Sequence, residues 1–314
     1  MDWGGILAPV CDWTLENGNG AVPGKIDKGY TTSNWANMVL NKQAVRECAA
    51  LAHLFRDQLV LGFFGFVAPK INNSPDCKWR RFCNFVPKVW LKPKKLNGLR
   101  LLIDPADWSQ TVIFEEIFLR SSYDLRKVTF TPSVIIDCGA HIGLFSLLSK
   151  SVFPNATVIA YEPNPVNAFF IRNQISRNKI DVTFYQLAVS TESKELNFVA
   201  INSHGGRLEG HGTDGCQSDT APVYEVEVID FCAAVKDIQP ESLLLKMDVE
   251  GEERNLLPAL VPVLPRQTAL FFETHAGEAG WREAEQLLLS TGFEVENINA
   301  RGLYYEGFAC RGAV

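Results

Sequence analysis

A strand that turns into a helix within residues 134–148, VIIDCGAHIGLFSLL, constrains the fold of this 314-residue chain more than any other segment. The apolar run from Val134 ends on Asp137, and the leucines that follow recur with helical spacing. Gly139 and Gly143 therefore lie in a strand-to-helix turn. In doubly wound α/β sheets a ligand binds beside such a turn, because glycines let the backbone approach it closely.

Four later apolar runs continue the pattern: TVIAYEP, VTFYQLAV, SLLLKMDVEG and TALFFETH. Each except VTFYQLAV is followed by helical spacing. Strands that alternate with helices predict a parallel sheet with right-handed crossovers. GFEVENI and GLYYEGFACR then predict a final hairpin. We therefore expect an α/β fold with a doubly wound, mostly parallel sheet.

Two regions depart from this alternation. Residues 1–87 are predicted to form a helical cap, and a hairpin around Asn97-Gly98 is expected to lead into the main domain. We therefore divide the chain into a cap that sets substrate specificity, 1–95, and a main domain, 96–314. A Gly-rich polar tract, 202–222, is either a mobile functional loop or a disordered one.

The ligand follows from what the glycine turn lacks. It has neither the G-x-G-x-x-G of a dinucleotide site nor the G-K-[ST] of a phosphate loop, so no phosphate is expected there. Glu162 ends the second strand, where an acid can accept hydrogen bonds from a ribose diol. Asp137 would suit a ligand that has a cationic centre. A nucleoside with a cationic centre and no phosphate points to S-adenosylmethionine. The alternative is that Asp137 caps the helix and Glu162 is a solvated strand end.

Ionisable residues also follow the fourth and fifth strands. Asp248 and Glu250 follow SLLLKM, while Glu273 and His275 end TALFFETH, at the same edge of a parallel sheet as Asp137. Carboxylates placed together have raised pKa values, so the cluster can supply a general base. The alternative is that Asp248, Glu250 and Glu253 serve only as caps, because all three fall at the start of a predicted helix, where the dipole favours acids. Coordination of Mg²⁺ by Asp248, Glu273 and His275 is left open.

The composition of the chain limits which binding partners and locations are expected. A net charge of −6 argues against general nucleic-acid binding, although residues 70–100 are basic and interleaved with aromatics. The longest apolar stretch, 59–68, has half the length that a membrane-spanning helix needs. Eight cysteines without a C-x-x-C pair, and no apparent signal segment, predict a cytoplasmic location.

These segments resemble the FkbM family of S-adenosylmethionine-dependent methyltransferases. The matching stretches, in family order, are VIIDCGAHIGLFSLL, YEPNPVNAFFIRNQISRN, LAVS, LLKMDVEGEE and FFETH. The pattern K-x-D-V-E-G-x-E is quite specific, whereas the glycine turn alone is not. The resemblance implies a Rossmann-like sheet of seven strands whose last strand is antiparallel.

The resemblance also implies a role for each site residue. The expected cofactor contacts are Asp137, Gly139, His141 and Gly143 near the methionine part, Glu162 at the ribose and Ala188 near the adenine. The residues expected at the reaction centre are Asp248, Glu250, Glu273 and His275. His141 departs from the family, which usually has asparagine at this position.

Family members mainly methylate hydroxyls of sugars, polyketides and other secondary metabolites, so the first hypothesis is O-methylation of a small or medium-sized metabolite. The second hypothesis is methylation of nitrogen, including the amides of a peptide. The third is a methyltransferase-like binding subunit without activity, which degraded glycines or acids would indicate. This chain keeps all of these glycines and acids.

Overall fold

The computed structural model describes residues 89–91, 96–104, 107–120, 122–200, 206–208 and 223–312. The chain divides into two units, Met1–Val89 and Trp90–Val314, and all of the described residues except Val89 belong to the second unit. The predicted helical cap and most of the basic segment 70–100 lie outside the described residues. The domain boundary at residue 95 stays a prediction.

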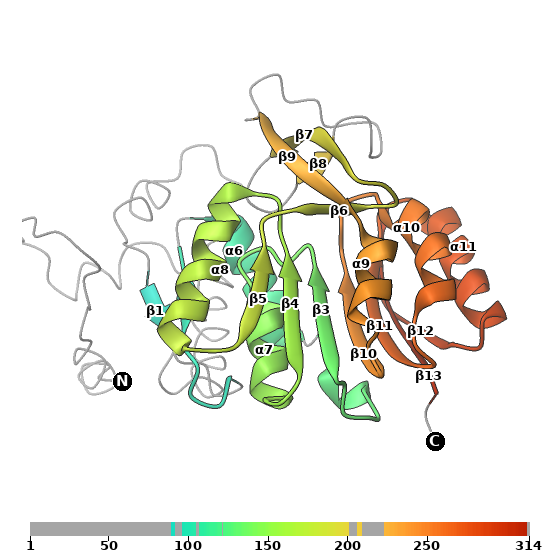
Figure 1. Ribbon diagram of the computed structural model, residues 1–314, viewed down its shortest axis with the longest axis horizontal. Helices are drawn as coiled ribbons and strands as arrows, with labels where there is room; N and C mark the ends of the chain where they lie inside the picture. Colours follow the sequence, from blue (N-terminus) through green and yellow to red (C-terminus); the bar gives the residue numbers. More distant parts are fainter. Residues whose placement is uncertain are drawn as a thin grey trace, which may run out of the picture. The chain divides into compact units, whose positions relative to one another are not determined.

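A seven-stranded sheet forms the centre of this unit, in the order β12-β13-β11-β10-β3-β4-β5 (Figure 1). Its strands are β3 Val134–Cys138, β4 Thr157–Tyr161, β5 Val182–Tyr185, β10 Ser242–Met247, β11 Gln267–Thr274, β12 Glu294–Arg301 and β13 Tyr304–Arg311. Neighbouring strands from β5 to β11 run parallel, and β13 runs antiparallel to both β11 and β12. The predicted fold class and the final hairpin are confirmed.

The strand order reverses beside β3. The chain runs outward from β3 through β4 to β5, then returns to lay β10 on the other side of β3. The carboxyl ends of β3 and β10 are therefore neighbours, and such a reversal is where open α/β sheets bind ligands.

Helices cover both faces of the sheet. They are α7 Leu144–Val152, α8 Pro165–Asn178, α9 Phe231–Ile238, α10 Glu253–Leu260 and α11 Gly277–Ser290, with 3₁₀ turns at Leu125–Lys127 and Val261–Val263. The residues of α9, α10 and α11 pack against alternate positions of β3 and β10, such as Ile136 and Leu245. The opposite face packs against α7, where Phe145 meets Phe271. None of the helices in the described ranges is long and apolar enough to cross a membrane.

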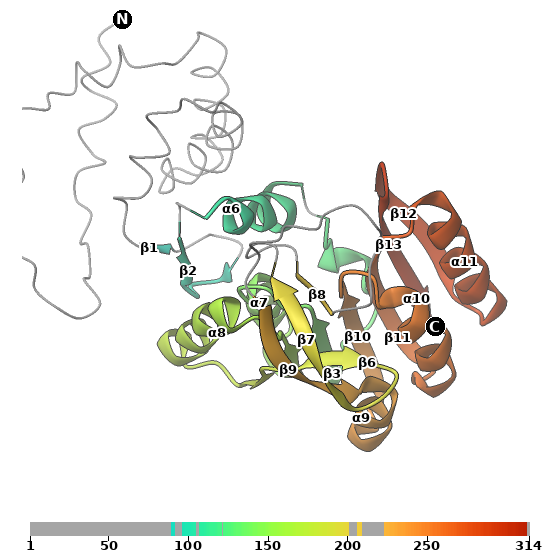
Figure 2. The same ribbon diagram turned by 90° about the horizontal axis from the view of Figure 1, so that it is seen from above.

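A smaller sheet lies over the carboxyl ends of the main strands, as the two views in Figures 1 and 2 show. Its strands are β6 Ala188–Ser190, β7 Lys194–Ala200, β8 Gly206–Leu208 and β9 Val223–Asp230, in the order β6-β9-β7-β8. The apolar run VTFYQLAV does not form one strand, and Ala188 lies after the third strand of the main sheet, as expected. The run divides into β5 and β6, because Ala188 and the two residues after it leave the main sheet and pair with β9.

A short two-stranded sheet of β1 Val89–Leu91 and β2 Leu101–Ile103 precedes these elements in the chain. Asn97 and Gly98 both have positive φ, as the type I′ turn requires, and the Leu99 amide donates to Leu96 at 2.9 Å. Helix α6 Trp108–Phe114 follows and continues as a π-helix, Glu115–Arg120. Such π-helical turns occur frequently at functional sites.

Candidate functional site

Asp137 is fully buried at the end of β3 and is held by the start of α7. Its Oδ2 accepts hydrogen bonds from the backbone amide of Ser146 at 3.1 Å and from the Ser146 hydroxyl at 2.6 Å. These bonds satisfy donors in the first turn of the helix, so Asp137 does cap it. Its contact with a cofactor stays a prediction.

The glycine turn needs left-handed backbone at three positions. Gly139, His141 and Gly143 have φ of +74°, +51° and +83°. Histidine and asparagine tolerate this region better than most residues, which explains why either can stand at position 141. At Gly139 a Cβ would lie 1.8 Å from the carbonyl oxygen of Asp248, so this glycine permits close contact between the turn and the loop after β10.

Helix α6 also reaches this turn. The Ser109 hydroxyl lies 3.5 Å from Nε2 of His141, and both residues are buried. The sequence reading assigned no role to α6. Its short polar start, which follows the hairpin, offered no periodic signal.

Glu162 lies directly after β4 and is buried, with 5% of its surface exposed. Its Oε2 accepts from the His141 amide at 2.8 Å, and its Oε1 accepts from the Asn164 amide at 2.9 Å and the Asn167 side chain at 3.3 Å. Burial raises the pKa of Glu162 to about 7, against the lowering effect of these bonds. The carboxylate is thus fixed in place and is not a solvated strand end.

Ala188 begins β6 and is buried. It lies three residues beyond Tyr185, whose carbonyl accepts from the Glu162 amide at 3.2 Å. The hydroxyl of Ser190 in the same strand donates to the buried carboxylate of Glu252 at 2.7 Å. This bond ties the smaller sheet to the loop that carries the predicted reaction centre.

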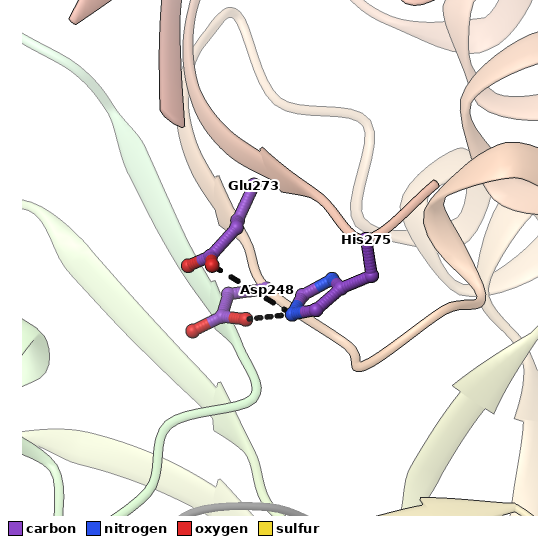
Figure 3. A group of neighbouring side chains, drawn as sticks. All are labelled: Asp248, Glu273 and His275. Carbon is purple, nitrogen blue, oxygen red and sulfur yellow. Dashed lines mark ion pairs between the residues drawn. The ribbon is translucent and has the colours of Figure 1, made fainter. Parts of the chain in front are cut away.

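His275 contacts every other residue of the predicted reaction centre. Its Nε2 lies 3.3 Å from Glu250, 3.7 Å from Glu273 and 4.0 Å from Asp248, while Nδ1 lies 3.1 Å from Glu253. Figure 3 shows Asp248 and Glu273 converging on that Nε2. The structure therefore brings the four predicted residues together and adds Glu253.

The charges of this cluster shift its pKa values. Burial alone would lower the pKa of His275, but the neighbouring carboxylates, with Glu253 first, hold it well above its usual range. Burial raises the pKa of Glu250 to about 8, with His275 pulling it down. Burial and then the charge of Asp248 raise the pKa of Glu273 well above its usual value. These shifts favour the charged imidazolium at His275 and oppose ionisation of Glu250 and Glu273.

Glu250 occupies strained backbone. Its φ is +54°, in the left-handed region that a residue with a Cβ rarely adopts. Glu253 fixes this turn, because its carboxylate accepts from the amides of Val249 at 2.8 Å and Gly251 at 2.9 Å. Strain of this kind, which costs about 1–3 kcal/mol, gathers at functional sites. A third of the Glu250 side chain is exposed, so a substrate can reach it.

The sequence reading assigned no role to Lys246, the first residue of the pattern K-x-D-V-E-G-x-E. It lies inside the apolar run of β10, and its ammonium lies 3.8 Å from Asp137 and 3.4 Å from Asp248. Burial disfavours its charge, but Asp248 and Asp137 outweigh burial and raise its pKa. The signal was a lysine in a strand that is otherwise apolar, since lysines are almost never fully buried unless paired.

A comparison with protein families identifies the domain that carries these residues. The model described as "Methyltransferase FkbM domain" matches residues 137–295, about half of the chain. The chain belongs to the FkbM methyltransferase domain family. The recognition made from the sequence motifs is confirmed.

Two curated proteins are similar in sequence to this chain. "Methyltransferase sdnD" of Sordaria araneosa is 46% identical over 173 residues, which cover 46% of the chain and 66% of that protein. "31-O-demethyl-FK506 methyltransferase FkbM" of Streptomyces tacrolimicus is 26% identical over 211 residues, which cover 58% of the chain and 81% of that protein. The chain thus spans just under two thirds of the Sordaria relative's length.

Among solved structures, the methyltransferase FkbM from Methylobacillus flagellatus KT is similar with a TM-score of 0.41 and 16% identity. The match covers 62% of this chain and 47% of that one.

Proposed function

We propose that this chain transfers the methyl group of S-adenosylmethionine to a hydroxyl of a small or medium-sized metabolite. The observation that carries the proposal is that four carboxylates lie within 4.0 Å of the His275 ring nitrogens. They lie at the same edge of the sheet as the Glu162 carboxylate, which is held by hydrogen bonds. Membership of the FkbM family supports it. The retained glycines and acids argue against an inactive binding subunit.

The cofactor end would use Glu162. A carboxylate has about four acceptor positions, and three donors occupy those of Glu162, so a ribose hydroxyl can take the fourth. The Asn167 amide makes the longest of the three bonds and is the one that a second hydroxyl would displace. The acceptor oxygens of Glu162 therefore fit the two hydroxyls of a nucleoside's ribose. Gly139, His141 and Gly143 would lie beside the methionine part and Ala188 beside the adenine.

The first test is binding. We expect calorimetry at pH 8, where Glu162 with its pKa of about 7 is mostly ionised, to detect S-adenosylmethionine binding to the native chain. Glu162→Ala should weaken it by about 1.5–3 kcal/mol, the range for hydrogen bonds to a charged group. The matched control is Glu192→Ala, since that side chain is 67% exposed. Absence of binding by the native chain would end the cofactor proposal.

The reaction centre would remove the acceptor's proton. S-adenosylmethionine supplies a sulfonium methyl, and the new O–CH₃ bond forms as the S–CH₃ bond breaks. The hydroxyl proton must then pass to a base, which raises the rate by about 10²–10⁴-fold. The raised pKa of His275 favours its doubly protonated imidazolium, so we assign the base to a carboxylate, with Glu250 the most exposed of those with a raised pKa. His275 would donate to that carboxylate and hold it in place.

The acceptor is proposed from one relative. The Streptomyces protein is named as a methyltransferase of 31-O-demethyl-FK506. Specificity would come from the N-terminal region, 1–95, and from the smaller sheet over the strand ends. A screen of hydroxyl-bearing metabolites with methyl-labelled cofactor is expected to find the acceptor; label found only on amines or peptide amides would favour N-methylation instead. The cytoplasmic location and the lack of general nucleic-acid binding stay predictions.

A divalent metal is the variant of this mechanism. The ligand atoms of Asp248, Glu273 and His275 lie within 4.8 Å of one another, and Nδ1 of His275 is held by Glu253 in the manner of metal-binding histidines. These residues would hold Mg²⁺, which would polarise the acceptor hydroxyl.

We nevertheless expect chelation to leave turnover unchanged, because the Nε2 atom of His275 that would bind the metal already lies 3.3 Å from Glu250 and can donate to that carboxylate instead. The measurement is the initial rate after dialysis against ethylenediaminetetraacetate, then with Mg²⁺ added back. Loss of turnover that Mg²⁺ restores would contradict the metal-free mechanism.

A further inference from the structure

Lys246 is buried in the middle of a sheet. It is the fifth residue of β10, all six of whose residues are buried, and 2% of its surface is exposed. Strand β10 is paired on both sides, by β3 and β11. An ammonium in such a place is strongly destabilising unless it is paired and hydrogen-bonded.

The ammonium of Lys246 lies opposite Asp137, its register partner on β3. Its Nζ lies 3.8 Å from Oδ1 of Asp137, a buried atom that makes no hydrogen bond within the described part of the chain. The charge of Lys246 therefore compensates an oxygen that Ser146, bonded to Oδ2, does not reach.

The same ammonium contacts both sides of the crevice. It donates to the carbonyl of Gly139 at 2.5 Å, in the glycine turn, and forms an ion pair with Asp248 at 3.4 Å, in the loop after β10. The loop also contacts the end of β3, since the Asp248 amide donates to the Cys138 carbonyl at 3.2 Å. One buried charge thus joins the two segments at the point where the strand order reverses.

We propose that Lys246 is a positioning residue that couples the glycine turn, 139–143, to the loop 248–253, so that cofactor binding at the turn orders the loop. The inference rests on the proposed function and deepens it. Lys246 touches neither the cofactor nor the acceptor in this account. It acts through Gly139 and Asp248.

The test uses a pair of substitutions that keeps the buried charge balanced. Lys246→Met alone leaves Asp137 uncompensated and is expected to unfold readily. Lys246→Met with Asp137→Asn removes both charges and should recover a cooperative unfolding transition. The control is Lys150→Met, because the Lys150 amine also donates to a backbone carbonyl, that of Ala156, at the other end of the sheet.

Two measurements use S-adenosylhomocysteine as the probe. In the native chain its binding should slow amide hydrogen exchange of residues 248–253 by about tenfold or more, the size of an ordinary coupling between sites. Because Asp137 is itself an expected cofactor contact, calorimetry sets the probe concentration that saturates each variant, and in the saturated, folded double variant the slowing should fall to about twofold or less. Lys150→Met should behave as the native chain.

A double variant that binds the probe and protects the loop like the native chain would overturn the coupling and leave the proposed function standing. The same holds if it fails to fold while the milder Lys246→Gln folds and retains full loop protection. A native chain that binds neither S-adenosylmethionine nor the probe would overturn the proposed function, and the inference with it.

Discussion

Glu250→Gln is expected to lower kcat by about 10²–10⁴-fold, the usual worth of a general base, with the cofactor's dissociation constant little changed. Glutamine keeps the size of the side chain and its contact with His275, 3.3 Å away, but cannot accept the acceptor's proton. The measurement is kcat with the acceptor that the labelled-cofactor screen identifies, alongside cofactor calorimetry. Glu283→Gln is the matched control, because that side chain is half exposed and pairs only with Arg254 among the residues described.

The pH profile gives the same assignment an independent check. Because the pKa of Glu250 is raised to about 8, its carboxylate is mostly protonated below that pH and ionised above it. The native kcat should therefore rise through about pH 7–9 and then level off. His275→Ala should move this rise to higher pH, since the imidazolium lowers the pKa of Glu250. A Glu250→Gln variant with near-native kcat, or a native profile that falls over this range, would move the base to Glu273, the N-terminal region or the acceptor itself.

The sheet could be predicted because its signal is local. Buried parallel strands are continuous apolar runs, such as the one that ends at Asp137, and each helix follows within a short turn. The smaller sheet could not be predicted in the same way. Its β6 is three residues long and pairs with β9, about forty residues later, so nothing in the neighbouring sequence indicates the partner.

The residues of the candidate site also differ in whether local sequence could predict their roles. Residues that end strands, such as Asp137, Glu162 and Asp248, could be assigned to one edge from topology alone. The state of His275 could not, because its charge depends on Glu253, which the sequence reading took only for an acid at the start of a helix. The buried lysine between Asp137 and Asp248 became visible only when the register of β3 and β10 was known.

The second large effect is expected from Gly139→Ala, which should lower the free energy of unfolding by about 2–5 kcal/mol. Two costs add. The backbone at φ +74° is unfavourable for alanine by about 1–2 kcal/mol, and the new Cβ would lie 1.8 Å from the Asp248 carbonyl oxygen and 2.9 Å from its carbon. Those are backbone atoms, so either the glycine turn or the loop after β10 must move. Chemical denaturation measures the loss.

Gly292→Ala separates the two costs. Gly292 also has positive φ, +83°, but a Cβ there would meet nothing within 4 Å, so this variant should lose only about 1–2 kcal/mol. The difference between the variants then measures the contact between Gly139 and Asp248. In whatever fraction of Gly139→Ala remains folded, cofactor binding should weaken and Asp248 should be displaced from His275, so turnover should fall further than the folded fraction does. Equal losses in the two variants, with native turnover per folded molecule, would contradict a close fit between the turn and the loop.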